Sequence, residues 1–196
     1  MGSITLNKPS GGQLTIAPED GTSNETVSIP SAGVGKILQV MQAVKTDTFN
    51  TSSNGTFVDV SGLSVTITPT SASSKFVLLA SLVISADYNA NPCLRFSGGN
   101  SGNYVGDARG SRRRVAWSGG DDWFNGSSST VSSQMAFTAQ LSYVDSPATT
   151  NEITYKVQAM GDANGGIYIN REPSDPDSSG EGFTTASSLI IMEVAA

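Results

Sequence analysis

Aromatic rings and carboxylates gather in one short, glycine-containing segment of the sequence, and this combination could act on a saccharide. Aromatic side chains offer apolar ring faces, and carboxylates and amides offer hydrogen-bonding groups beside them. Two carboxylates roughly 5 to 10 Å apart could also cleave a glycosidic bond. The segment carries Trp117, Asp121, Asp122, Trp123, Phe124 and Asn125.

The spacing of the two acids argues against cleavage. Asp121 and Asp122 are adjacent, and adjacent side chains on a strand point to opposite faces. The sequence has no histidine, which excludes Ser-His-Asp triads, Cys-His pairs and histidine-based zinc sites. We therefore expect a non-enzymatic protein without catalytic residues. The segment would either bind a saccharide without cutting it or, as the favoured alternative, anchor its indoles on the fold or in a subunit interface.

Four arginines, Arg109, Arg112, Arg113 and Arg114, form the sharpest charge feature of the chain. On a strand, Arg112 and Arg114 would project to one side and Arg113 to the other. Because arginine pairs with carboxylates in a bidentate manner, the cluster suits contacts between subunits. Pairing within the chain, with acids such as Asp107, Asp121 or Asp122, or exposure to solvent is an equally supported alternative.

Neither a metal site nor a cofactor is expected. Asp175, Asp177 and Glu181 are spaced loosely like calcium ligands, but the fuller pattern with a bidentate glutamate is missing, which favours a solvated acidic loop. The single cysteine, Cys93, cannot form an intrachain disulfide. We expect it to be a small buried apolar residue.

Apolar residues alternate with Ser, Thr and Gln along most of the chain, which predicts β-strands. No window shows an apolar period of 3.6 residues over a helical length. The predicted fold is all-β: a two-sheet antiparallel sandwich, jelly-roll-like, over residues 34–196. The segments 98–131 and 170–184 are expected to be loops at one end. The expected strands lie near residues 36–48, 56–60, 62–68, 75–88, 92–97, 132–145, 152–161 and 185–195, with short additions at 103–106, 112–117 and 166–170.

The strand predicted at 75–88 is apolar on both faces. Phe76, Leu78 and Leu82 fall on one face, and Val77 and Leu79 fall on the other. A strand of this kind is expected at the centre of a sheet, with something covering both of its sides.

Residues 1–33 form an extended N-terminal β arm or attachment segment. Short strand-like pieces at 4–6, 13–17 and 26–29 are separated by prolines and glycines, and they are too small to bury much surface alone. Fully extended, the arm could reach about 110 Å, enough to cross a neighbouring subunit. The alternative is that it packs back on its own domain as two extra strands.

Composition excludes several classes of partner. The net charge of −6 argues against nucleic acid. No window approaches the ~18 continuous apolar residues of a membrane-spanning helix, and the first ten residues lack the pattern of a signal peptide. Only 14% of residues are charged, a composition typical of a turn-rich all-β protein.

Several motifs occur in an order that resembles a domain of virion structural and tail-fibre proteins of tailed bacteriophages, especially those of marine bacteria and cyanobacteria. The resemblance covers about residues 33–196. The motifs are GKILQVMQAVKTDTF from Gly35, FVDVSGLSVTITP from Phe57, SSKFVLLASLVIS from Ser73, GDARGSR from Gly106, SYVDSPATTNEITYKVQA from Ser142, YINR from Tyr168 and SSLIIMEVAA from Ser187.

The resemblance implies a virion protein that is assembled in the host bacterial cytoplasm, forms a homotrimer and contacts other capsid or tail proteins through its N-terminal arm. The sequence has no heptad stretch, collagen-like repeat or long shaft. This favours a capsid decoration protein, of the head-fibre or cement type. The alternative is a tail fibre or spike that recognises a host surface polysaccharide.

Overall fold

The computed structural model describes Ile4–Asn7, Gln13–Ile16 and residues 37–87, 90–119, 136–163, 165–179 and 182–196. The chain divides into two compact units, Met1–Ala32 and Gly33–Ala196. In the first unit, β1 (Ile4–Asn7) and β2 (Gln13–Ile16) form an antiparallel ribbon that pairs Ile4 with Ile16 and Leu6 with Leu14. The strand expected at 26–29 lies outside the described residues.

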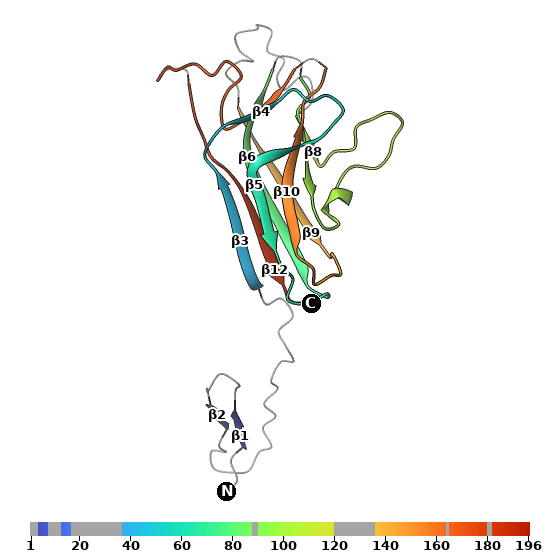
Figure 1. Ribbon diagram of the computed structural model, residues 1–196, viewed down its shortest axis with the longest axis vertical. Helices are drawn as coiled ribbons and strands as arrows, with labels where there is room; N and C mark the ends of the chain where they lie inside the picture. Colours follow the sequence, from blue (N-terminus) through green and yellow to red (C-terminus); the bar gives the residue numbers. More distant parts are fainter. Residues whose placement is uncertain are drawn as a thin grey trace, which may run out of the picture. The chain divides into compact units, whose positions relative to one another are not determined.

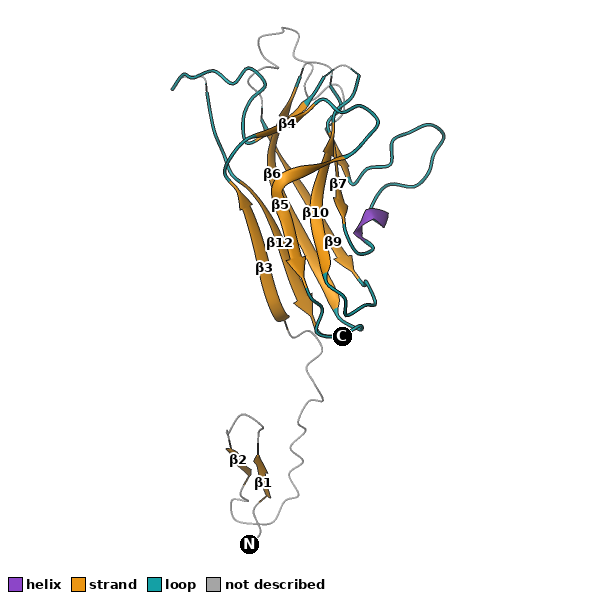
Figure 2. Cartoon of the chain, in the orientation of Figure 1, coloured by secondary structure: helices purple, strands orange, loops and turns teal. Residues whose placement is uncertain are grey.

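The second unit is an eight-stranded jelly roll with two short additional strands (Figures 1 and 2). One sheet has the order β3-β12-β6-β9, and the other has the order β5-β10-β7-β8. All pairs between these strands are antiparallel, and the connectivity is that of two interlocked Greek keys. The predicted fold class is confirmed. The strands are β3 (Ile37–Lys45), β5 (Val58–Ile67), β6 (Lys75–Ala86), β7 (Cys93–Ser97), β8 (Trp117–Ser118), β9 (Phe137–Asp145), β10 (Ile153–Met160) and β12 (Ser187–Val194).

Two short strands lengthen the first sheet at one end. β11 (Ile167–Ile169) pairs with the end of β6, and β4 (Phe49–Thr51) pairs with β11. A single 3-10 turn, η1 (Ser101–Asn103), follows β7.

The core lies between the two sheets and follows the alternation of the strands. Phe76, Leu78 and Leu82 point inward from β6, and Tyr155 and Val157 point inward from β10 to meet them. The rings of Phe76 and Tyr155 lie 5.8 Å apart in a tilted arrangement. Each large apolar side chain buried in this way contributes about 1.5–3 kcal/mol, so the alternating pattern is what holds the two layers together.

The prediction of two separate strands at 56–60 and 62–68 is wrong, because β5 is one strand. Its partner β10 pairs Lys156 with Ser64 and Gln158 with Asp59, so the register shifts between them. Gly62 lies in this interval with φ +83°, a conformation that glycine adopts without strain. The Ser-Gly pair thus forms a β-bulge within the strand and not a turn between two strands.

Two other expectations for the connections also fail. Residues 103–106 and 112–116 are not strands, and only Trp117 and Ser118 of this region join the sheet. The long segment from residue 98 to 116 leaves β7 at the end opposite the loop of residues 170–184, because β7 and β10 run in opposite directions, and it then returns toward the start of β7, where Arg113 contacts Asp162.

The jelly roll therefore has two different ends along the direction of its strands. Ile37 at the start of β3 is the register partner of Val194 at the end of β12. The connections 46–57, 87–92 and 161–186 lie at the other end, which we call the loop end (Figure 1).

Candidate functional site

The loop end is built on a polar cluster around Asp87, which follows β6. Tyr168 of β11 donates its hydroxyl to both carboxylate oxygens of Asp87, at 3.0 and 3.1 Å. The backbone N–H of Gly166 donates to Oδ2 at 2.7 Å. Burial and the neighbouring Asp87 carboxylate raise the pKa of Tyr168 above its usual value, so Tyr168 remains a hydrogen-bond donor at neutral pH.

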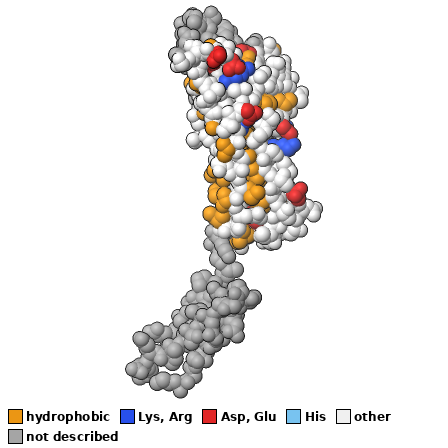
Figure 3. All heavy atoms as spheres, turned by 60° about the vertical axis from the view of Figure 1, so that its left-hand side comes forward, with side chains coloured by type: hydrophobic (Ala, Val, Ile, Leu, Met, Phe, Trp, Pro, Cys, Tyr) orange, Lys and Arg blue, Asp and Glu red, His pale blue; other side chains and the backbone are white. Residues whose placement is uncertain are grey.

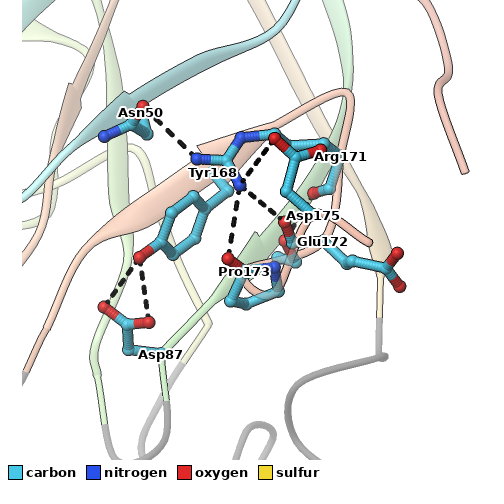
Figure 4. Close-up of polar contacts among 8 residues, drawn as sticks. Asn50, Asp87, Tyr168, Arg171, Glu172, Pro173 and Asp175 are labelled. Carbon is cyan, nitrogen blue, oxygen red and sulfur yellow. Dashed lines mark hydrogen bonds and ion pairs between the residues drawn. The ribbon is translucent and has the colours of Figure 1, made fainter. Parts of the chain in front are cut away.

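Arg171 completes this cluster by lying over the face of the Tyr168 ring, while Asp87 bonds to the hydroxyl at the tip of the ring (Figure 4). The guanidinium carbon lies 4.5 Å from the ring centroid. The guanidinium donates to Asn50 Oδ1 at 3.4 Å, and it forms an ion pair with Asp175 at 3.6 Å. It also donates to the carbonyls of Glu172 at 2.9 Å and Pro173 at 3.3 Å. Because these groups bond to one another, the cluster joins three segments of the loop end, which we call the clasped loops.

Asn170 holds the same loops to the sheet from inside. Its Nδ2 donates to the carbonyls of Lys45 and Asp47, each at 2.9 Å, and its Oδ1 accepts a hydrogen bond of 2.6 Å from Ser187 Oγ. Asn170 is fully buried and has φ +65°, a left-handed conformation that asparagine tolerates better than most residues. The end of β3, the segment after it and the start of β12 are fixed by this one side chain.

The predicted arginine cluster lies on a loop and not on a strand. Arg114 Nε donates to the Gly106 carbonyl at 2.8 Å, and Arg112 donates to the Arg109 carbonyl at 3.4 Å. Arg113 contacts the buried Asp162 carboxylate at 3.9 Å. Asp162 was not among the acids expected from the sequence, and it also accepts the backbone and side-chain N–H groups of Asn91 at 3.0 and 3.1 Å. The role of the four arginines in subunit contacts stays a prediction.

The predicted saccharide segment is described only at its start. Trp117 pairs with Leu94 and packs, partly buried, against the core. The other residues of that prediction, Asp121, Asp122, Trp123, Phe124 and Asn125, lie outside the described residues.

An open pocket of about 380 Å³ was not predicted. Tyr104 and Tyr143 line it with their rings stacked at a centroid distance of 5.0 Å. The rest of the lining comes from residues that flank the arginine loop: Asn103, Val105 and Gly106 before it, and Val115 and Ala116 after it. No sequence signal identified it, because Tyr104 and Tyr143 are far apart in the chain. Stacked aromatic rings beside backbone polar groups offer a surface that a saccharide could use.

The described part of the chain shows no group of three or more metal-ligating side chains that could hold an ion. It also has no helix long and apolar enough to cross a membrane. Cys93 is a buried free thiol, 2% exposed, as the sequence suggested.

Comparisons with known proteins find likenesses among solved structures. One match is a structure of infectious bursal disease virus, Gx strain, with 11% identity and a TM-score of 0.35, covering 98% of this chain and 50% of that chain. Another is the VP2 subviral particle of the same virus, with 13% identity and a TM-score of 0.33, covering 91% of this chain and 46% of that chain. The chain thus spans about half the length of these proteins, and likeness at this level assigns it no function. No family model and no curated protein matches the sequence.

Proposed function

We propose that the chain is a non-enzymatic virion structural protein that decorates a bacteriophage capsid as a homotrimer and is assembled in the host bacterial cytoplasm. The observation that carries the proposal is the separation of the two ends of the jelly roll. The chain enters at Ile37 beside the point where β12 finishes at Val194, whereas the clasped loops lie at the opposite end. This arrangement suits a domain that is tethered at one end and presents the other.

The tether in this proposal is the N-terminal segment, which contacts other capsid or tail proteins. Its β1-β2 ribbon has four residues in each strand, and a two-stranded ribbon of this size is marginal in water without a partner surface. The resemblance of residues 33–196 to phage virion domains supports the same assignment. Neither nucleic acid nor a membrane is a proposed partner.

A binding experiment tests the decoration role. Particles of the phage that encodes the chain, prepared without it, are mixed with the purified full chain and sedimented. We expect saturable cosedimentation at a fixed ratio to the major capsid protein, and tailless heads should bind as well as complete particles. Binding to complete particles but not to heads would contradict decoration of the capsid.

The alternative function is a tail fibre or spike that recognises a host surface polysaccharide. The pocket beside Tyr104 and Tyr143 favours it, together with the predicted segment 117–125. Soluble chain would then compete with phage for adsorption to host cells. The variant Tyr143→Ala would lose this competition, whereas a decoration protein would not compete at all.

A further inference from the structure

The outer face of the β3-β12-β6-β9 sheet carries exposed aliphatic side chains. Val40, Val44 and Val144 are 55%, 56% and 53% exposed, and Leu38 and Leu79 are 37% and 38% exposed. Leu79 and Val144 alternate with residues that point toward the core, whereas on β3 the neighbouring Ile37 and Met41 are exposed as well, at 54% and 43%. Hydrophobic side chains gather in the lower half of the jelly roll, on the side where β3 lies (Figure 3). We call this surface the outer face.

The register shows that four of these side chains, all except Leu38, belong to continuous rows across four strands. Met192 pairs with both Val40 and Val77, and Val77 pairs with Val144, so one row is apolar from edge to edge. None of the residues in this row or the next two is charged or aromatic. The second row is Gln42, Ile190, Leu79 and Ser142, and the third is Val44, Ser188, Ser81 and Gln140.

The size of the outer face is that of a protein interface. Four strands about 4.8 Å apart and nine residues long span about 19 by 30 Å, or about 570 Å² in projection. The corrugated accessible surface is larger than its projection. It therefore approaches the roughly 800 Å² that each partner contributes to a stable complex.

The chemistry of the outer face selects among partners. Without arginine or lysine in its three rows it offers nothing to nucleic acid or to anionic lipid headgroups, and without aromatic rings it is a poor surface for a saccharide. The first row is aliphatic and the next two add only aliphatic, serine and glutamine side chains, so the three rows are uncharged and complementary to another surface of the same kind. Since net charge is −6 per chain, an interface free of charge also avoids bringing like charges together.

We propose that three copies of the chain associate by turning their outer faces toward a common three-fold axis. Three sheets about 19 Å wide that form a triangular prism would each lie about 5.5 Å from the axis. Packed sheets lie about 10 Å apart, so each lies about 5 Å from the plane between them. The width of four strands therefore fits a filled three-fold core. This inference rests on the proposed homotrimer and assigns the surface that forms it.

Light scattering of the full chain tests the inference at micromolar concentration. We expect a mass near three times 20.2 kDa. The double variant Val40→Glu/Val144→Glu should dissociate to 20.2 kDa, with a loss of association of at least 100-fold. The matched control Ser64→Glu/Thr66→Glu, at exposed positions of β5 in the other sheet, should remain a trimer. A trimer that survives in the Val40/Val144 variant overturns the inference, as does a wild-type monomer or dimer.

A gentler substitution keeps the test valid if the charged variant does not fold. Val144→Cys and Ser64→Cys each add one thiol to a chain whose own Cys93 is 2% exposed. We expect thiol labelling of Val144→Cys to be at least tenfold slower than that of Ser64→Cys. Equal rates overturn the inference. Particle binding is measured separately for each variant, so a failure of the outer face as the interface is distinguishable from a failure of the decoration role.

Discussion

The hydroxyl of Tyr155 donates a hydrogen bond of 2.8 Å to Oδ2 of Asp145, and both side chains are fully buried. The same carboxylate accepts the backbone N–H groups of Asn100 at 3.0 Å and Ser146 at 2.8 Å. Burial and the Asp145 charge raise the pKa of Tyr155 above its usual value, so the phenol remains a donor. This pair links β10, the end of β9 and the segment after β7.

Replacing Tyr155 with Phe should lower the free energy of unfolding by about 1–3 kcal/mol, because the buried Asp145 carboxylate loses a donor. Urea unfolding followed by circular dichroism measures the change. The control is Thr66→Val, which removes an exposed hydroxyl pair with Thr154 and should cost less than about 0.5 kcal/mol. Equal effects of the two substitutions would contradict the role given to the pair.

Replacing Glu193 with Gln should reduce the loss of stability that the protein undergoes as the pH falls toward 2. Burial by itself raises the pKa of Glu193, but hydrogen bonds from Gln39 and from the backbone N–H and hydroxyl of Thr70 outweigh it and lower the pKa to about 2. A carboxyl whose pKa is lower in the folded state stabilises the protein above its unfolded value of 4.5, and this stability is lost as pH falls toward 2. The shift corresponds to at most about 3 kcal/mol.

Thermal unfolding between pH 7 and pH 2 measures this dependence. The control Asp59→Asn removes a carboxylate whose pKa is lowered mainly by the neighbouring Lys156, at an exposed site. It should leave the acid limb nearly unchanged, because exposed pairs contribute little. If stability depended on pH in the Glu193→Gln variant as it does in the wild type, Glu193 would not control acid unfolding.

Substitutions at Asn170 should separate backbone strain from lost hydrogen bonds. Asn170→Gly keeps the left-handed conformation but leaves the Lys45 and Asp47 carbonyls without their donor, at a cost of about 2–4 kcal/mol. Asn170→Ala adds the strain of φ +65° and should cost about 1 kcal/mol more. Exposed Ala148, at φ +53°, is the control: Ala148→Gly should not destabilise the protein. Chemical denaturation of all three variants gives the comparison.

Gly99→Ala should be among the most damaging single substitutions. A Cβ at this position would lie 2.2 Å from Asp145 Oδ2, and the residue has φ +51°. We expect a loss of more than about 3 kcal/mol, since strain is combined with displacement of a buried carboxylate. Gly110→Ala is the matched control. Gly110 has φ +60° but open space around it, so only about 1 kcal/mol should be lost.

The strands were predictable where the apolar period of two is uninterrupted. The prediction at 75–88 corresponds to β6, Lys75–Ala86, and the one at 185–195 corresponds to β12, Ser187–Val194. The pattern failed at Gly62, because a serine and a glycine look the same in a bulge and in a turn. Only the register of the opposite strand distinguishes them.

The polar clusters could not be predicted, because their members meet only after the sheets have formed. Asn170 bonds to the carbonyl of Lys45 across 125 positions, and Tyr168 bonds to Asp87 across 81. The apolar residues on both faces of β6 correctly indicated a strand in the interior of a sheet. Within the described part of the chain the second sheet covers its inner face, whereas Leu79 on its outer face stays exposed. The local pattern of the strand therefore indicates an apolar outer face but does not identify a surface that would cover it.

The pairing of Ile37 with Val194 places the start of β3 and the end of β12 at the same end of the jelly roll. A passenger protein joined after Ala196 would emerge beside the start of β3 and point away from the loop end. Engineered display would therefore proceed better through insertions at the loop end than through a fusion after Ala196, and an affinity tag there would leave the loop end free for its own contacts.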